Sequence, residues 1–581
     1  MKMGVELNKI SKKFLDTGFL VNPNVVKQLP EDFDFENFIS LVNLKFKRKP
    51  LLINKDVIGF VLNNSYNELP SLPSDSLNSL SSNPLEINWQ GFDEARVIRE
   101  KGGDRKMYRA FLDILDYASN PHNKKIGKML ESVSKEAPRL RDTDVIIEQD
   151  KGVEDFDNSL MVLDIYNEDS KEREVQDFVN YFKARYNSLK NILVSRQSLQ
   201  NVTSINRIKS RFERGNVGVI GIVNEKRVTK NGNILFGLED LTGGISVLVN
   251  KNKGELFEIA KDILLDEVVG INGMCDPGFG GRSIIFCDEI IFPEIPMDQE
   301  FKKLDKEVYA VFTGDVHLGN KFFCAEPFLR FIDWINGMAG SREQREIAKK
   351  IKYLFFVGDL VEGVGVYPNQ DKDLDIKDVY EQYSVFADLI SKIRKDVKVV
   401  VIGGNHDAIR IAEPQPFLDK KLAAPLYKLP NVVIANNPAT INICSSPTFS
   451  GFDILLYHGF SFPYVSENVE SIRANGRLKR PDLIMKTLLQ KRHLAPPHNS
   501  SLYVPDSRDD PLVIKKVPDF FISGHIHRTS VVNYKHISLI GCGCWVEQTE
   551  DQRKRGIEPD PSRVILVNLQ TREMKLLYFG D

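Results

Sequence analysis

The chain has 581 residues, of which 42% are hydrophobic and 27% are charged, and its formal net charge is −2. This is the composition of an ordinary globular protein, and the length is enough for roughly three or four domains. No apolar run approaches the roughly 20 residues of a membrane-spanning helix. The six dispersed cysteines do not form a disulfide framework. These features exclude membrane-spanning and disulfide-stapled classes, and we expect a protein of the reducing cytoplasm.

The N-terminal third divides into two parts by composition. Residues 1–67 carry apolar residues at helical spacing in ISKKFLDTGFLV and FDFENFISLV, which predicts a small helical module that docks a partner. Residues 68–174 begin with a Ser/Pro/Asn-rich stretch, ELPSLPSDSLNSLSSNP, and continue as a mixed, highly charged region. We interpret 68–174 as a linker followed by a region without a clear structural assignment.

The sequence pattern of residues 175–295 predicts one helix followed by a small β-barrel. Apolar residues at i, i+3, i+4 and i+7 indicate a helix over 175–194. Five short strand-like runs then follow between about 215 and 293, with a helical piece between the third and the fourth, which matches an OB-fold. OB-folds often bind single strands by stacking bases on aromatic side chains. Few aromatic residues of this region are expected on the surface, and the main candidate is Phe236. The sequence is therefore at least as consistent with a barrel that serves as a packing platform for a partner or a neighbouring domain.

The sequence pattern of residues 296–581 predicts a layered α/β domain. Near-continuous apolar runs at 308–315, 353–359, 397–407, 452–459 and 517–527 indicate strands buried on both faces. Helical patterns at 327–338 and 379–395 lie between them. Each strand ends in glycine followed by a polar residue, and in such folds ligands bind beyond the carboxyl ends of the strands.

The five strand ends carry the chemistry. The short sequences GDVHLG, GDLVEG, GGNHD, YHG and GHIH offer seven oxygen and nitrogen ligands: Asp315, His317, Asp359, Asn405, His458, His525 and His527. This set suits a pair of divalent cations, and its mixture of N and O atoms favours Mn²⁺, Fe²⁺ or Zn²⁺ over Mg²⁺. We expect Asp359 to bridge the two ions. A pair of ions held in this way hydrolyses phosphate esters.

The expected division of the other six ligands is three to each ion. We place Asp315, His317 and His527 on one ion, and Asn405, His458 and His525 on the other. Any one of these residues alone would more often be a turn residue or a satisfied core group. All five sequences, in order and each after a strand, make the metal interpretation specific.

Two further residues of GGNHD are expected to act in catalysis. His406 titrates near neutrality, so it could protonate the departing oxygen or stabilise charge in the transition state. We expect Asp407 to orient the His406 ring.

Basic residues near these sequences are candidates for contact with a nucleic acid backbone. Residues 473–492 carry seven cations against one acid, and the candidates there are Arg477, Lys479, Arg480, Lys491 and Arg492. Arg410, which follows GGNHD, is a further candidate. A solvated helix face is an equally consistent interpretation of the basic run.

The five sequences resemble the calcineurin-like metallophosphoesterase superfamily, whose pattern is GDxH, GDxx, GNHD/E, H and GHxH. IRIAEPQPF, KRHLAPPH, DDPLVIKKVPDFFISGHIH and GCWVEQTEDQ further resemble the small subunits of archaeal family D DNA polymerases, over roughly residues 175–581. The resemblance implies an Mre11-like 3′→5′ proofreading exonuclease that uses Mn²⁺, with an OB-fold packed on the phosphoesterase. It also implies the same metal ligands, with His406 as the catalytic histidine.

The partners that the resemblance implies are a large catalytic polymerase subunit and DNA with a 3′ end. A sliding clamp is a further candidate, although no convincing Gln-x-x-aliphatic-x-x-aromatic-aromatic string is present. The sequence has no P-loop and no second carboxylate motif for nucleotidyl transfer, so a polymerising centre would belong to the partner. Two alternatives stay open: a non-catalytic assembly subunit, and a stand-alone repair nuclease or small-molecule phosphoesterase.

Overall fold

The computed structural model describes residues 159–166, 172–199, 201–278, 283–505, 509–548 and 558–580, with isolated positions at 20, 21, 35, 38, 39, 52, 53 and 553. The chain separates into two compact units, Met1–Glu148 and Gln149–Asp581. In the first unit, β1 (Leu20–Val21) pairs in parallel with β2 (Leu52–Ile53). The predicted helical module and most of the 68–174 region otherwise lie outside the described residues.

The second unit contains two six-stranded mixed sheets. The first has the order β12-β11-β10-β9-β18-β19. Its first four strands are parallel, whereas β18 and β19 are antiparallel additions at one edge. The strands are β9 (Tyr309–Thr313), β10 (Ile351–Val357), β11 (Lys398–Ile402), β12 (Val432–Ile434), β18 (Arg563–Asn568) and β19 (Met574–Tyr578).

The second sheet has the order β16-β17-β15-β14-β13-β3, with β14, β15 and β17 parallel. Its strands are β3 (Leu160–Val162), β13 (Ala439–Ile443), β14 (Phe452–Tyr457), β15 (Phe520–Ser523), β16 (Ser530–Tyr534) and β17 (Ile537–Gly541). The edge strand β3 pairs antiparallel with β13. It comes from the region before the barrel, for which no structural element was predicted, so the end of the 68–174 region contributes a strand to this sheet.

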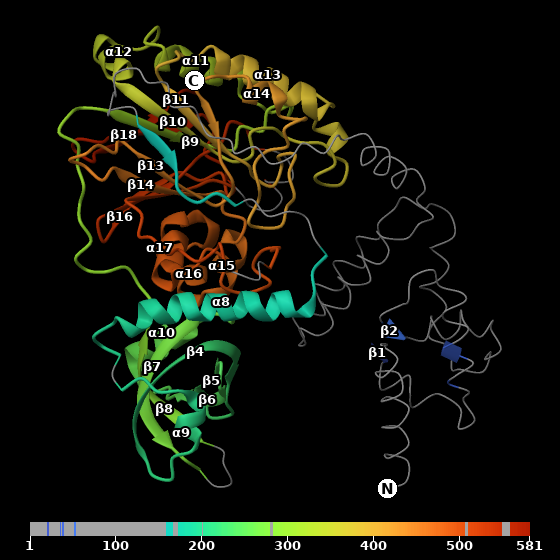
Figure 1. The fold of residues 1–581 in the computed structure, drawn as a ribbon. Helices are drawn as coiled ribbons and strands as arrows, with labels where there is room; N and C mark the ends of the chain where they lie inside the picture. Colours follow the sequence, from blue (N-terminus) through green and yellow to red (C-terminus); the bar gives the residue numbers. More distant parts are fainter. Residues whose placement is uncertain are drawn as a thin grey trace. The chain divides into compact units, whose positions relative to one another are not determined.

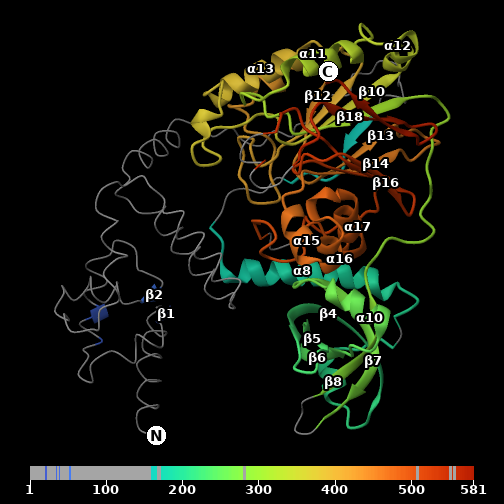
Figure 2. The same ribbon diagram turned by 180° about the vertical axis from the view of Figure 1, so that it is seen from behind.

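The two sheets pack face to face and helices cover both outer faces, which gives four layers. Phe312 of the first sheet lies between Phe355 of the same sheet and Phe520 of the second, with ring centroids 4.9 and 6.1 Å apart. Figures 1 and 2 show the helices above and below the sheets. They are α11 (Ala325–Ile335), α12 (Arg342–Lys349), α13 (Val379–Ser391) and α14 (Ala424–Tyr427) on one side, and α15 (Phe462–Asn468), α16 (Glu470–Ala474) and α17 (Pro481–Lys491) on the other. The predicted layered α/β architecture is confirmed.

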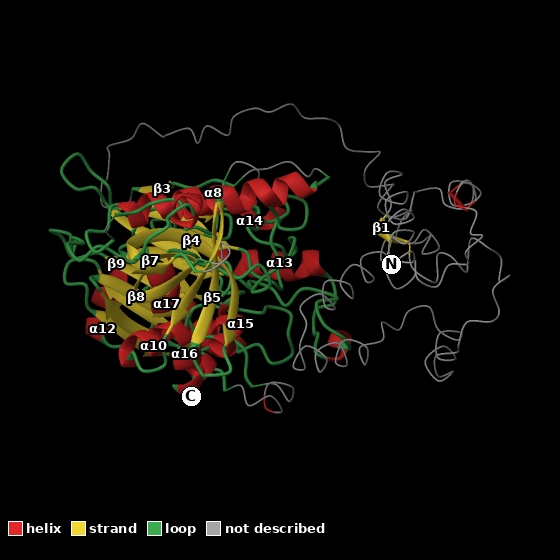
Figure 3. Ribbon diagram, turned by 90° about the horizontal axis from the view of Figure 1, so that it is seen from below, coloured by secondary structure: helices red, strands yellow, loops and turns green. Residues whose placement is uncertain are grey.

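The barrel closes in the order β4-β5-β6-β8-β7, and Figure 3 shows several of its strands side by side. The predicted five strands, and the helix between the third and the fourth, are present. The elements are α9 (Ile205–Lys209), β4 (Gly215–Val228), β5 (Ile234–Asp240), β6 (Gly243–Val249), α10 (Gly254–Lys261), β7 (Val268–Asp276) and β8 (Ile284–Ile291).

One expectation about the barrel was wrong. Phe236 is only 1% exposed, because strand alternation points it inward beside its cross-strand partner Val247. It therefore cannot act as a surface stacking residue. The assignment of this barrel as an OB-fold stays a prediction.

Helix α8 (Val175–Val194) lies between the barrel and the phosphoesterase helices α15–α17 (Figure 1). Its buried Arg185 is bound on several sides: Nε donates to Asp510 Oδ2 at 2.7 Å, and Nη1 donates to the Pro496 carbonyl at 2.5 Å. Asp510 also accepts from Tyr181 at 2.8 Å and from His493 at 2.8 Å. A buried charge is tolerated only when it is paired and hydrogen-bonded in this way.

A second buried ion pair joins the barrel to α17 directly. Lys491 Nζ lies 2.5 Å from Glu267 Oε1, and both side chains are under 5% exposed.

No helix among the described residues is long and apolar enough to cross a membrane.

We predict that Asp510→Asn lowers the free energy of unfolding by about 3–5 kcal/mol, because it leaves the buried Arg185 guanidinium without its counter-charge. Thermal and urea unfolding of the whole chain would measure this loss. The matched control is Asp509→Asn, whose exposed ion pair with Lys515 should be worth less than about 1 kcal/mol. Equal effects of the two substitutions would contradict the stabilising role of the buried pair.

Candidate metal centre

The predicted ligands lie on loops that leave the carboxyl ends of strands in both sheets. Asp315 and His317 follow β9, Asp359 follows β10, and Asn405 follows β11, all in the first sheet. The remaining ligands follow strands of the second sheet: His458 follows β14, and His525 and His527 follow β15. The two sheets therefore contribute to one site at their shared edge.

The ligand loops have an unusual backbone. Five ligand residues adopt left-handed backbone conformations, with φ of 49° at Asp315, 50° at His317, 47° at Asp359, 71° at His525 and 56° at His527. Such conformations are uncommon outside glycine and persist only where the surroundings enforce them. Here the loops brace one another: the Asp315 amide donates to the Gly358 carbonyl and the His317 amide donates to the Asp359 carbonyl, each at 3.0 Å.

Glycine is required where these loops touch. A Cβ on Gly358, whose φ is +84°, would lie 2.3 Å from the His458 ring. A Cβ on Gly404 would lie 2.3 Å from Asp359 Oδ1. The absence of side chains at these two positions lets the ligands converge.

The seven side chains meet around Asp359. Asp359 Oδ2 lies 3.6 Å from His317 Nε2 and 3.3 Å from His458 Nε2. His317 Nε2 lies 3.1 Å from His527 Nε2, and His458 Nε2 lies 3.1 Å from Asn405 Oδ1. Two clusters of ligand atoms result, Asp315–His317–His527 and Asp359–His458–His525, each with all atoms within 4.8 Å of one another. Asp359 belongs to the second cluster, and Asn405 adjoins that cluster through His458. The division of the ligands between two ions stays a prediction.

The tautomers of two histidines follow from their partners. His458 Nδ1 donates to the Val357 carbonyl at 2.9 Å, and His317 Nδ1 faces Glu362 Oε2 at 2.9 Å. In each ring, Nε2 is left to face the cluster. The Nε2 atoms of His317 and His527 face each other, an arrangement that a cation between them would satisfy.

Burial dominates the electrostatics of the site. It raises the pKa of Asp315 to about 7, lowers the pKa of His525 to about 3, and holds that of His527 well below its usual range. Neutral imidazoles at neutral pH are the form that binds metals. Burial also opposes charge on Asp359, but His458 and His406 hold its pKa well below its usual range. His525 and His527 thus offer neutral nitrogen atoms. Although burial opposes their charge, Glu362 raises the pKa of His317 to about 9 and Asp359 raises that of His458 to about 10, so a bound cation would have to displace a proton from each of these two rings.

Glu362 is a site residue that the sequence prediction missed. It is 2% exposed, and its carboxylate accepts from the Tyr367 hydroxyl at 3.0 Å and from the Gln370 amide at 3.2 Å while it faces His317. Its backbone carbonyl accepts from His406 Nδ1 at 2.9 Å. Glu362 therefore fixes two site histidines. The available signal was its place three residues after Asp359 in GDLVEG.

The predicted role of Asp407 was wrong. Its carboxylate accepts from the Tyr383 hydroxyl at 2.9 Å, from the Gly404 amide at 2.8 Å and from the Leu360 amide at 3.2 Å. The side chain points beneath the loop, away from the His406 ring, and burial raises its pKa to about 6. Asp407 holds the backbone of the ligand loops, and Glu362 orients His406.

The basic candidates fall into two groups. Lys491 and Arg492 are 5% and 3% exposed, and Arg492 donates to the carbonyls of Ile514 and Lys515. Their prediction as DNA contacts was wrong, because both side chains, at the C-terminal end of α17, point into the interior of the protein. The other four are less buried but each has a partner: Arg477 with Glu467, Lys479 with Glu558, Arg480 with Asp482, and Arg410 with the carbonyls of Ala412 and Pro414.

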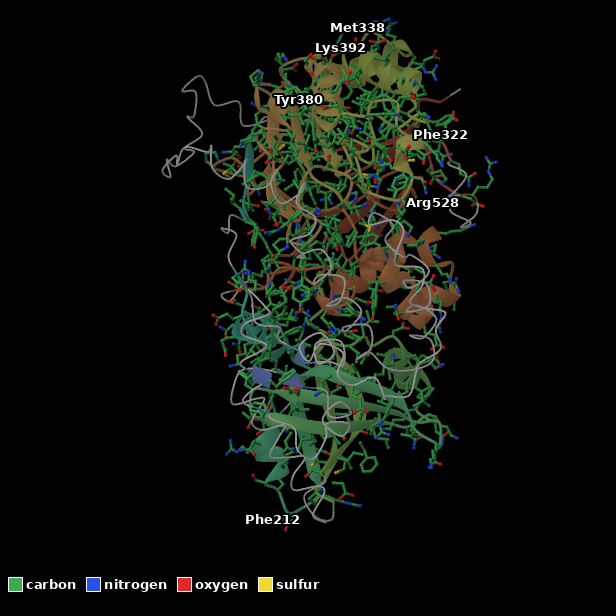
Figure 4. The ribbon with its side chains drawn as sticks, turned by 90° about the vertical axis from the view of Figure 1, so that its right-hand side faces the viewer. Phe212, Phe322, Met338, Tyr380, Lys392 and Arg528 are labelled. Atoms are coloured by element: carbon green, nitrogen blue, oxygen red, sulfur yellow. The ribbon has the colours of Figure 1, made fainter. Side chains whose placement is uncertain are left out.

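An unpredicted cation lies next to the site. Arg528 follows His527 directly and donates to the Glu558 carbonyl at 2.9 Å, and Glu558 also pairs with Lys479. Figure 4 labels Arg528 on the phosphoesterase domain. Arg528 and Lys479 thus form a link between the ligand loop and the basic segment 473–492.

Comparison with known proteins agrees with this geometry. The profile of the calcineurin-like phosphoesterase family matches residues 309–529. The DNA polymerase II small subunit of Methanothermobacter thermautotrophicus is 39% identical over 426 residues, which cover 73% of this chain and 84% of that protein. The small subunit of Halobacterium salinarum is 35% identical, and the match covers 70% of this chain and 75% of that protein. The small subunit of Pyrococcus furiosus is 36% identical, and the match covers 72% of this chain. It covers 66% of the Pyrococcus protein, slightly under two thirds of that protein's length.

The fold and the site define a protein with a calcineurin-like metallophosphoesterase domain. The similarity along most of the chain is more specific. The chain belongs to the family of DNA polymerase II small subunits, the small subunits of archaeal family D DNA polymerase. A solved asparaginyl-tRNA synthetase from Pyrococcus horikoshii matches 16% of the chain with a TM-score of 0.15 and 21% identity, which is too low to carry an argument.

We predict that Gly358→Ala abolishes tight binding of Mn²⁺, because the added methyl group would displace the His458 ring. Calorimetric titration with Mn²⁺ would measure the loss. Gly365→Ala is a matched control: φ is +80° there too, but nothing lies within 4 Å of the added Cβ. Equal losses in both variants would assign the effect to backbone strain rather than to the ligand geometry.

We also predict that Glu362→Gln weakens Mn²⁺ binding by roughly 10–100-fold, because His317 loses a charged partner that holds its ring. The same titration would measure the change. Asp373→Asn is the control, since Asp373 also accepts from Tyr367, at 3.2 Å, but is not hydrogen-bonded to either histidine. Wild-type affinity in Glu362→Gln would remove Glu362 from the metal centre.

Proposed function

We propose that this chain is a metal-dependent 3′→5′ DNA exonuclease that proofreads as the small subunit of a two-subunit replicative polymerase. The observation that carries the proposal is the convergence of the complete ligand set on Asp359, with His406 beside it. The digestion polarity and the proofreading role rest on the resemblance to family D small subunits. The relatives are named as small subunits, which supports a large catalytic subunit as partner.

The proposed centre holds two divalent cations, with Mn²⁺ the first choice and Fe²⁺, Zn²⁺ or Mg²⁺ as alternatives. Asp315, His317 and His527 would hold one cation, Asn405, His458 and His525 the other, and Asp359 both. Such a pair lowers the pKa of a water and clamps a phosphodiester for in-line displacement. Asn405 contributes a neutral oxygen, which limits the negative charge that the substrate meets.

His406 is positioned for proton transfer to the departing oxygen. Because its Nδ1–H donates to the Glu362 carbonyl, Nε2 is the atom available to a substrate. Its ring centroid lies 4.5 Å from that of His317, so it adjoins the proposed metal positions. Burial lowers the pKa of His406, which favours release of a proton from its charged form.

The proposed path of the DNA follows the cations that remain accessible. Arg477, Lys479 and Arg480 lie on and beside a short turn before α17, and Lys479 is linked to the ligand loop through Glu558 and Arg528. We propose these residues, with Arg410, as backbone contacts. We further propose that 175–295 is a helix and an OB-fold. Residues 296–581, completed by the edge strand β3, would form the exonuclease domain. Residues 1–67 would dock a partner, and a sliding clamp is one candidate.

The test is digestion of 3′- and 5′-labelled single-stranded and mismatched oligonucleotides with each divalent metal in turn. Chelation with EDTA should abolish cleavage and Mn²⁺ should restore it. His406→Ala should slow cleavage by about 10²–10⁴-fold while Mn²⁺ binding persists. The exposed histidine variant His536→Ala should retain the wild-type rate.

Two outcomes would overturn the proposal. Full cleavage by His406→Ala would remove that residue from the mechanism. Absence of cleavage with every metal, both alone and with the co-purified large subunit, would favour a non-catalytic assembly subunit.

A further inference from the structure

The barrel carries a basic segment that the proposed hydrolysis does not use. Residues 205–214, INRIKSRFER, contain four cations and one acid; we refer to them as the barrel-tip segment. Arg207 and Lys209 are exposed and form no ion pair with any residue that the structure describes. Arg214 pairs with Asp276, yet its side chain stays 73% exposed. The barrel-tip segment therefore presents accessible positive charge.

The barrel-tip segment is held firmly to the barrel. Ile205 and Ile208 of α9 are fully buried in the barrel core. The Ile205 amide donates to Asp240 Oδ2 at 2.9 Å and the Asn206 amide donates to Thr242 Oγ1 at 3.0 Å. The cations thus project from a fixed support, which lowers the entropy cost of binding a ligand.

An aromatic side chain lies among these cations without any role in packing. Phe212 is 96% exposed, and Figure 4 shows it at the end of the barrel. A second aromatic, Phe286 of β8, is 41% exposed and points outward beside its cross-strand partners Leu248 and Met274. Exposed aromatic rings between cations are the elements with which proteins stack unpaired bases and hold their phosphates.

A groove begins at the barrel-tip segment and crosses the outer face of β5 and β6. It has a volume of about 490 Å³, and its lining includes Lys209, Asn224, Gly244, Ser246, Ser283 and Ile284. Gly244 lacks a side chain, and a Cβ there would meet only the Leu238 carbonyl, at 3.6 Å, so a ligand could approach the backbone closely at this position. At Gly237 the Asn224 side chain occupies the corresponding space. Asn224 and the two serines supply hydrogen-bonding groups. Ile284 lines the groove, and Phe286 lies two residues further along β8 on the same outer face.

The acids around the groove are already engaged. Glu225 pairs with Arg227 at 3.0 Å, and Glu239 accepts from Asn224 at 2.8 Å. Asp240 accepts from the Thr242 and Gly243 amides of its own turn. These contacts offset part of the negative charge that a phosphate would meet.

From these observations we propose that the barrel-tip segment and the adjoining groove bind single-stranded nucleic acid. Arg207, Lys209 and Arg211 contact phosphates, and Phe212 stacks on a base. A single strand fits better than a duplex, because stacking on Phe212 requires an unpaired base. The site is separate from the metal centre and would act as a second anchor for a strand.

The test is fluorescence anisotropy of the full chain with a labelled 20-nucleotide oligo-dT in EDTA, where no hydrolysis occurs. Phe212→Ala should weaken binding by about 5-fold or more. Arg207→Ala/Lys209→Ala should lower the slope of log K against log salt by about 1.4, since each phosphate contact contributes about 0.7. Both variants should fold normally, because all three side chains are exposed, and thermal unfolding would verify this.

Matched controls separate this site from general charge and aromatic effects. Lys420→Ala/Lys421→Ala removes two exposed cations from the phosphoesterase, and Tyr380→Ala removes a 46% exposed aromatic from α13. Both controls should bind as the wild type does. Unchanged affinity and salt slope in the barrel variants would overturn the proposal. The proposal would also be overturned if the barrel variants lost binding to the large polymerase subunit but kept wild-type affinity for oligo-dT. That result would make the surface a protein interface.

The two proposals fail independently. His406→Ala should bind oligo-dT normally, and Phe212→Ala should still cleave a trinucleotide too short to reach the barrel. Loss of trinucleotide cleavage in Phe212→Ala would instead show that the substitution perturbs the metal centre.

Discussion

The structure depends on keeping three carboxylates and five imidazoles together at a buried edge of two sheets. Burial raises the pKa of Asp315 to about 7 and lowers that of His525 to about 3, so the fold places these groups where charge is costly. Their loops also adopt left-handed backbone conformations. Inter-loop hydrogen bonds and the glycines Gly358 and Gly404 make the convergence sterically possible. The surrounding four-layer fold supplies the rigidity that holds it.

The strands and the positions of the candidate ligands at strand ends were predictable because they depend on local sequence. Strands buried on both faces need unbroken apolar runs. β9, β11, β14 and β15 lie within the predicted ranges, and β10 begins two residues before its predicted range, 353–359. Each ligand follows directly from a strand end. The grouping around Asp359 then follows from the common edge at which parallel strands end.

The directions of neighbouring side chains were not predictable. Asp407 follows His406 in sequence, yet its carboxylate lies under the loop, bound to Tyr383 and two amides. Lys491 and Arg492 belong to a basic run, and sequence spacing alone does not show that they face Glu267 and the carbonyls near residue 514. In each case, tertiary contacts decide which side of a turn or helix is interior.

The edge strand β3 changes how the molecule is divided. It pairs with β13 of the phosphoesterase sheet, and the chain then runs through α8 and the barrel before returning to β9. The barrel is thus an insertion within the phosphoesterase, anchored by chain connections on both sides and by Arg185 and Lys491. A fragment beginning at residue 296 would leave the backbone groups of β13 without their neighbour, an open strand edge of the kind that promotes association between copies. The phosphoesterase domain therefore includes β3, which precedes the barrel in the sequence.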